Sequence, residues 1–178
     1  MRIDSSDPLF LRINTKLARL DQEIALARQE VTAVPQDTPG RDRILARSIG
    51  FALHNFYNGV EQILEDIAKE VDGSRPVGDA AHQELLNQML QPTKLRPAII
   101  PDDAFPLFDD LRRFRHLFRH SYGIDLRFDD VMRKFDSVET DAWPRLLSTL
   151  AELQAHLDAD VGGEPTFDDG NGGPSGPA

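Results

Sequence analysis

The sequence contains no cysteine among its 178 residues. This absence excludes a disulfide framework, a thiolate metal site and a cysteine nucleophile, and it gives no sign of an oxidising compartment. The chain also begins without the apolar run of a signal peptide, and nowhere do 18 apolar residues follow one another. We therefore expect a cytoplasmic protein with no membrane association.

Several sequence signatures of enzymes are missing as well. The chain has no glycine-rich phosphate loop, no G-x-S-x-G nucleophile elbow and no kinase signature. Acidic pairs such as Asp109-Asp110 lack histidines at a metal-binding spacing, so we expect no metal site and no cofactor. The formal net charge of −10 argues against a protein that coats DNA or an anionic membrane with its whole surface.

Apolar residues recur at helical spacing along most of the chain, and no alternating strand pattern occurs. Thr38 followed by Pro39 indicates the start of a long helix, and Pro144 should kink or split the last helical region. The predicted helices cover about residues 9–31, 39–71, 80–90, 103–122 and 128–160. This pattern predicts an all-α antiparallel bundle of four to five helices, with the long helix, from Arg41 to Val71, antiparallel to helix 103–122.

The chain divides into three predicted parts. Residues 1–35 form an N-terminal helix, and residues 36–160 form the helical bundle. Residues 161–178 are rich in glycine and acid and have too few apolar groups to offset the entropy of ordering. We expect this last part to be a disordered tail.

Positive charge gathers in one predicted helix. Between Leu111 and Tyr122 the chain has four arginines, two histidines and no acid, whereas the remaining residues include 16 basic and 30 acidic ones. At about 100° per residue, the apolar side chains of this helix form one stripe and the basic ones spread over the opposite side. The apolar stripe consists of Leu107, Phe108, Leu111, Phe114, Phe118 and Tyr122. The basic side includes Arg112, Arg113, His116, Arg119 and His120. It either binds a ligand or is a solvated face that pairs with neighbouring acids. His54, His82 and His156 lie on other helices and receive no function.

Arginine and histidine together supply chemistry for RNA cleavage. Arginine is a permanent forked cation for a phosphodiester, and histidine titrates near neutral pH and can move a proton. RNA carries its own nucleophile in the 2′-hydroxyl, so a metal is not required. DNA lacks that hydroxyl, and a site of arginine and histidine therefore favours RNA over DNA as substrate.

At these residues the sequence resembles the HEPN superfamily, whose ribonucleases carry Arg, four to six residues and then His. Arg115 and His120 fit this pattern, and Ser121-Tyr122 extend it to the Arg-x4-His-x-Tyr form of the HepT branch. Residues 53–64 of the long helix are also similar to that branch, and the resemblance covers about residues 40–160. The extra arginines leave a second register open, because Arg113-x6-His120 satisfies the looser spacing.

The resemblance implies a dimeric helical bundle with ribonuclease toxin activity. It also implies a partner, an MNT-type nucleotidyltransferase antitoxin that adenylylates Tyr122. Our leading hypothesis is therefore a metal-independent endoribonuclease with Arg115 and His120 as catalytic residues, and with His116, Arg119 and Arg112 supporting RNA binding. The alternative function is a non-catalytic helical subunit that binds a nucleotidyltransferase or serves as its substrate, and a third is a purely structural oligomerisation domain.

Overall fold

The computed structural model describes residues 7–120 and 126–161, apart from the side chains of residues 120, 160 and 161. Within these ranges the protein is all α-helical, which confirms the predicted fold class. The elements are α1 (Pro8–Ala33), α2 (Arg41–Glu70), α3 (Ala81–Leu90), α4 (Phe105–His120), α5 (Phe128–Ser137), the π-helical turn η1 (Val138–Ala142) and α6 (Trp143–Val161). No helix in the described ranges is long and apolar enough to cross a membrane.

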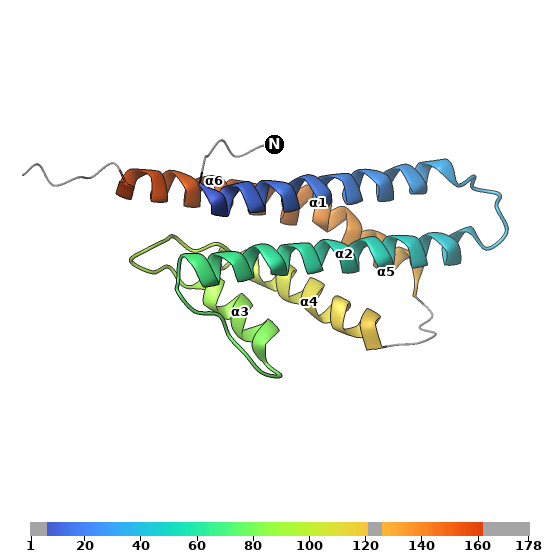
Figure 1. The fold of residues 1–178 in the computed structure, drawn as a ribbon. Helices are drawn as coiled ribbons and strands as arrows, with labels where there is room; N and C mark the ends of the chain where they lie inside the picture. Colours follow the sequence, from blue (N-terminus) through green and yellow to red (C-terminus); the bar gives the residue numbers. More distant parts are fainter. Residues whose placement is uncertain (1–6, 121–125, 162–178) are drawn as a thin grey trace, which may run out of the picture.

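Helix α2 is the centre of the bundle. It contacts α1, α3, α4 and α5, and in Figure 1 it lies between α1 and α6 on one side and α3 and α4 on the other. Helix α4 runs beneath α2 in the opposite direction (Figure 1). The contacts agree, since His54, earlier in α2, contacts Phe118, later in α4. Glu61, later in α2, contacts Arg115, earlier in α4. The predicted antiparallel pairing of these two helices is therefore confirmed.

Side chains near both ends of α1 form hydrogen bonds with backbone groups there. Asp7 caps α1 by accepting a hydrogen bond from the backbone N–H of Leu9 at 2.7 Å. At the other end, Arg41 donates to the carbonyls of Val31 and Val34, both at 3.1 Å, so two carbonyls at the C-terminal end of α1 have partners.

The start of the long helix at Arg41 is confirmed, whereas the N-cap predicted at Thr38, with Pro39 as the first helical residue, is wrong. Thr38 and Pro39 belong to the turn, in which the N–H of Arg41 donates to the carbonyl of Thr38 at 3.0 Å. Gly40 has a φ of 72°, a left-handed conformation that a helix cannot continue through, so α2 begins at Arg41.

The interruption predicted at Pro144 is present. Proline has no N–H, and its ring collides with the carbonyl four residues earlier in a regular helix. The chain widens into η1 just before it, where the N–H of Trp143 bonds to the carbonyl of Val138. Counting α5, η1 and α6 as one interrupted rod, the described residues form five helical rods.

One apolar core holds these rods together. It includes Phe10 and Ile13 of α1, Phe56 and Ile63 of α2, and Phe108 of α4, each at most 1% exposed. The N-terminal helix thus shares its core with the rest of the bundle. Phe118, which the apolar stripe predicted to be buried, is only partly buried, although it packs against the same core.

Candidate functional site

Arg115 points from α4 into a polar cluster on α2 and α3. Its Nε donates to Oδ1 of Asn58 at 2.6 Å, and one terminal nitrogen lies 3.2 Å from Oε2 of Glu61. The other terminal nitrogen lies 3.4 Å from Nε2 of His82. The side chains of Arg115 and Glu61 are only 13% and 7% exposed, so this ion pair is largely withdrawn from water. We call Asn58, Glu61, His82 and Arg115 the arginine clamp.

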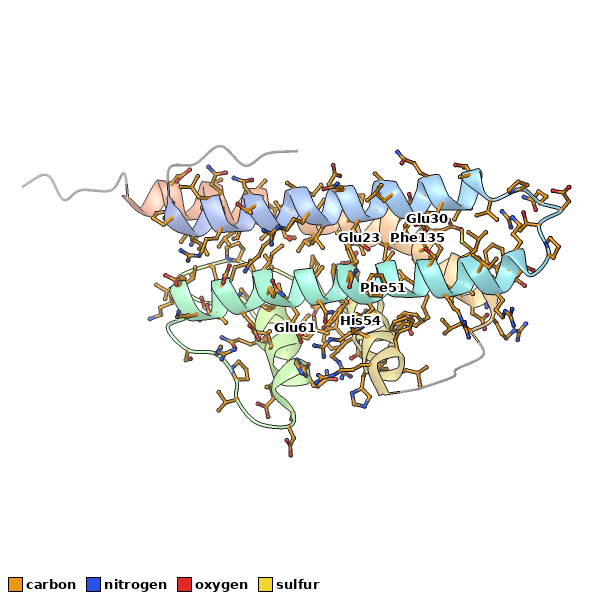
Figure 2. All side chains as sticks on the ribbon, turned by 45° about the vertical axis from the view of Figure 1, so that its right-hand side comes forward. Glu23, Glu30, Phe51, His54, Glu61 and Phe135 are labelled. Atoms are coloured by element: carbon orange, nitrogen blue, oxygen red, sulfur yellow. The ribbon has the colours of Figure 1, made fainter. Side chains whose placement is uncertain are left out.

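The clamp is a closed set of hydrogen bonds. Glu61 uses one carboxylate oxygen for Arg115 and the other for Nδ1 of His82. Because a guanidinium can only donate, Nε2 of His82 is the acceptor and Nδ1–H donates to Glu61. Each of the three nitrogens of the guanidinium thus has a partner, and the side chain is held in one orientation by two other helices. Figure 2 shows Glu61 on the side of α2 that faces α3 and α4.

His54 lies on α2 one helical turn before Asn58 of the clamp, beside the apolar part of α4. Its ring centroid is 5.5 Å from that of Phe118, and Figure 2 shows it on the same side of α2 as Glu61. Its Nδ1 is buried and has no hydrogen-bond partner among the described residues. Burial lowers the pKa of His54 below its ordinary 6.5, and the positive charge of Arg115 lowers this pKa further.

The two neighbouring arginines have a different setting. Asp109 accepts from Nε of Arg112 at 2.9 Å, and its other oxygen lies 2.6 Å from Arg113, so one acid of the same helix pairs with both. The side chain of Arg113 is 72% exposed. The alternative of a basic face that pairs with acids therefore describes these two residues well. Of the two possible motif arginines, Arg115 contacts α2 and α3, whereas the described contact of Arg113 is with Asp109 of its own helix.

The remaining site residues lie at the end of α4. His116 and Arg119 are exposed on this helix, and the charge of Arg119 also lowers the pKa of His54. His120 is the last residue of α4, but its side chain lies outside the described residues. Ser121 and Tyr122 lie outside them too. The structure thus brings Arg115 together with residues of α2 and α3, and the partner assigned to Arg115 by the motif is not among its described contacts.

Sequence reasoning missed the other members of the clamp. Glu61 had a detectable signal, because it is an acid at helical spacing from the buried Tyr57 and Leu64. Asn58 and His82 had none, since each is a polar residue on a partly exposed helix. Nothing in the sequence assigns His82 a function, but in the structure it contacts both Glu61 and Arg115.

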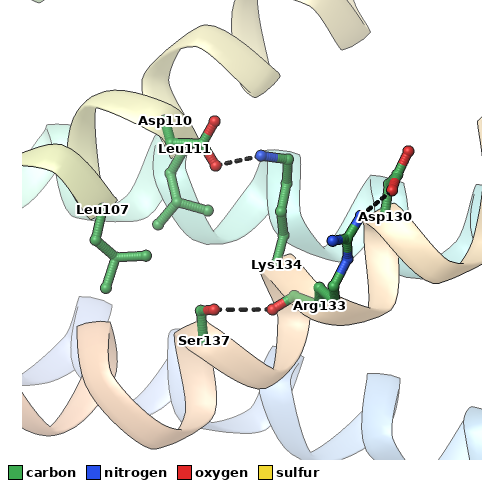
Figure 3. Close-up of a pocket in the computed structure, with 7 residues that line it drawn as sticks. All are labelled: Leu107, Asp110, Leu111, Asp130, Arg133, Lys134 and Ser137. Carbon is green, nitrogen blue, oxygen red and sulfur yellow. Dashed lines mark hydrogen bonds and ion pairs between the residues drawn. The ribbon is translucent and has the colours of Figure 1, made fainter.

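A separate hollow of about 450 Å³ lies between α4 and α5. Figure 3 shows that its charged side chains are already paired, Lys134 with Asp110 and Arg133 with Asp130. This pairing leaves no open charge for a ligand. Among the residues that the structure describes, no group of three or more His, Asp or Glu side chains could hold a metal ion.

The helical bundle, with an arginine and histidine motif near the C-terminal end of α4, resembles a HEPN domain. The family model described as HepT-like protein matches residues 48–157. Because this match covers more than half of the chain, the chain belongs to the HepT-like family of the HEPN superfamily. Comparison with curated proteins found no match, and comparison with solved structures found none.

Proposed function

We propose that the protein is a metal-independent endoribonuclease toxin of a toxin–antitoxin pair. Membership of the HepT-like family supports a HEPN-type toxin. The observation that carries the catalytic assignment is the arginine clamp, which withdraws Arg115 from water and fixes it in one orientation. Stability alone does not require such an arrangement, since apolar residues of similar volume often replace a buried ion pair at no cost.

The proposed reaction is an internal transesterification. His120 removes the proton of the 2′-hydroxyl, the 2′-oxygen bonds to phosphorus, and the bond to the 5′-oxygen breaks. A proton passes to the departing 5′-oxygen, which leaves a 2′,3′-cyclic phosphate and a 5′-hydroxyl. The clamp uses three of the five N–H donors of Arg115, and the two that remain on its terminal nitrogens stabilise the charge that builds on the phosphate oxygens. Because the clamp already holds the guanidinium, little reorganisation is needed at that moment. His116, Arg119 and Arg112 bind the RNA strand around this phosphate.

Charge-conserving substitutions test the role of Arg115. Arg115→Lys keeps the cation beside Glu61 but loses the fork that reaches three partners and the phosphate. Arg113→Lys is the matched control, because Arg113 lies two residues earlier on the same helix and pairs with Asp109 of that helix. We expect Arg115→Lys to lower kcat on a short RNA by about 10²-fold or more, while Arg113→Lys retains parental activity. Equal activity of the two variants would remove Arg115 from the mechanism.

We further propose that an MNT-type nucleotidyltransferase neutralises the toxin by adenylylating Tyr122. The chain has two tyrosines, and Tyr57 is only 1% exposed, so an enzyme cannot reach its hydroxyl in the folded protein. An adenylate on Tyr122 adds a bulky anion two residues after His120, where charge and volume both oppose RNA binding.

Co-expression with the nucleotidyltransferase encoded nearby tests this mechanism. We expect intact-mass and peptide mass spectrometry to show added AMP on Tyr122. Tyr122→Phe should keep its toxicity and escape neutralisation. An unchanged mass, or equal neutralisation of Tyr122→Phe and the parent, would mean that the antitoxin acts by binding alone.

The active unit in this proposal is a homodimer. Residues five apart on an ideal helix point about 140° away from each other, so one chain places Arg115 and His120 poorly. A two-fold interface can bring Arg115 of one subunit towards His120 of the other. Phe51 on α2 and Leu117 on α4 are more than half exposed and offer apolar surface for this contact. A monomer in light scattering at micromolar concentration, with ribonuclease activity intact, would rule out the composite site.

The second candidate function is a non-catalytic subunit that binds a nucleotidyltransferase or is its substrate. The exposed basic residues of α4 favour it equally, since they can bind an acidic protein surface. Expression without the antitoxin separates the two, because growth arrest that depends on His120 is expected only of the toxin.

A further inference from the structure

A polar groove of about 310 Å³ lies between α1 and α2. Its polar lining consists of Lys16, Arg19, Glu23, Asn55, Asn58 and Gln62. Figure 2 shows Glu23 on the α1 side of this groove. The volume is at the small end of the range for ligand sites, about 300–1,000 Å³, and the lining is amide-rich and charged where most such sites are apolar.

The groove is continuous with the arginine clamp through one side chain. Asn58 lines the groove, and its Oδ1 accepts the hydrogen bond from Nε of Arg115. The oxygen and the nitrogen of an amide diverge from the same carbon, so Nδ2 of Asn58 is not the atom that faces Nε of Arg115. No described residue accepts a hydrogen bond from that Nδ2, which is not buried. A ligand held by Arg115 therefore has a further donor within reach on the groove side.

The other groove residues leave open hydrogen-bonding groups of both kinds. Nδ2 of Asn55 donates to Glu23 at 3.1 Å, which leaves Oδ1 of Asn55 as an acceptor. The amide of Gln62 makes no side-chain hydrogen bond to the residues that the structure describes, so it offers both a donor and an acceptor. These are the groups that read the edges of unpaired bases in single-stranded RNA.

The charged side chains of the groove are one acid, Glu23, and two bases, Lys16 and Arg19, and the two bases differ in their pairing. Lys16 is already engaged, since it lies 2.5 Å from a carboxylate oxygen of Asp66 and donates to the carbonyl of Gln62 at 3.0 Å. Arg19 is exposed, and no acid in the described part of the chain pairs with it. It is thus the groove cation that an incoming phosphate can engage without first breaking an ion pair.

We propose that this groove binds the nucleotide next to the scissile phosphate of the RNA. Arg19 contacts a backbone phosphate, and the amides of Asn58 and Gln62 bind the edge of the adjacent base. The inference rests on the proposed ribonuclease function and gives the N-terminal helix, which precedes the residues matched by the family model, a part in substrate binding.

Binding of a short fluorescent single-stranded RNA tests the groove apart from cleavage. The measurements use full-length His120→Ala, so that the RNA stays intact, and compare Arg19→Gln with Arg12→Gln by anisotropy at several salt concentrations. Arg12 is the matched control because it lies two turns earlier on α1, outside the groove, and pairs with Glu70. We expect Arg19→Gln to weaken binding about 5- to 10-fold and to reduce the salt slope by about one, and Arg12→Gln to do neither.

Base recognition is tested on the otherwise unchanged protein with a randomised RNA pool. We expect Gln62→Ala to relax the base preference at one position beside the cut while cleavage continues. If the parent cleaves RNA but Arg19→Gln behaves like Arg12→Gln and Gln62→Ala keeps the parental pattern, the groove inference is wrong and the ribonuclease proposal stands. A loss confined to binding of the antitoxin would overturn the inference as well. A parent that neither binds nor cleaves RNA would remove the proposed function itself.

Discussion

The ion pair between Glu61 and Arg115 should show a large energetic coupling. Glu61→Gln leaves a cation that is 13% exposed without its counter-charge. Breaking a buried pair in this way costs about 3–5 kcal/mol, and the remaining exposure places this variant near the lower limit. Arg115→Met should cost less, about 1–2 kcal/mol, because Glu61 keeps its hydrogen bond from His82. The double variant removes both charges together.

A double-mutant cycle measures this coupling. The four proteins are unfolded in urea at pH 7.5, followed by circular dichroism, and their free energies of unfolding are obtained by linear extrapolation. We expect the double variant to lose about 1–3 kcal/mol less unfolding free energy than the sum of the losses of the two single variants. Costs that add to within about 0.5 kcal/mol would show that the two side chains do not interact in solution, which would refute the clamp.

Three further effects follow from the packing and from one histidine. Gly59→Ala should destabilise the protein by about 1–3 kcal/mol despite the helix propensity of alanine, because the added Cβ would lie 2.4 Å from Leu20. A variant that is more stable than the parent in urea unfolding would contradict the close approach of α1 and α2. Phe118→Ala should cost about 2–3 kcal/mol and Phe108→Ala about 3–5 kcal/mol, since Phe118 is only partly buried; the reverse order would show that α4 presents another face. Because folding lowers the pKa of His54, this residue contributes to the free energy of unfolding. The contribution is complete above the unfolded pKa of about 6.5 and is lost as the pH falls through the folded pKa. His54→Gln should therefore flatten the decline in unfolding free energy between pH 7.5 and 5, and a decline as steep as that of the parent would exclude this source.

The sequence predicts the helices well because their cause is local. The apolar period along α2 and the breakers around it are short-range signals, and so is Pro144, which forces the π-helical turn before it. The N-cap of α2 was misplaced because Thr38-Pro39 is compatible with a helix start and equally with a turn. The left-handed conformation of Gly40 ends the turn there, so α2 begins at Arg41. The local sequence pattern does not distinguish these two structures.

The sequence indicates Arg115 but not its partners, because local pattern does not contain contacts between distant parts of the chain. Arg115 stands out in the sequence because three further arginines and two histidines gather around it. Its partners come from α2 and from α3, as far as 57 residues away in the chain, so no spacing rule connects them. The side chain of His120 and all of Tyr122 lie outside the described residues, so the assignment of this end of the motif rests on the family pattern.

Ribonuclease activity in the absence of metal tests the central claim most directly. Purified parent and His120→Ala are incubated with a mixed RNA pool in the presence of a chelator, with His156→Gln, a substitution on α6, as the matched control. The account predicts that the parent and His156→Gln cleave RNA to 2′,3′-cyclic phosphate ends and that His120→Ala does not. Intact RNA with the parent, or equal cleavage by His120→Ala, would contradict it.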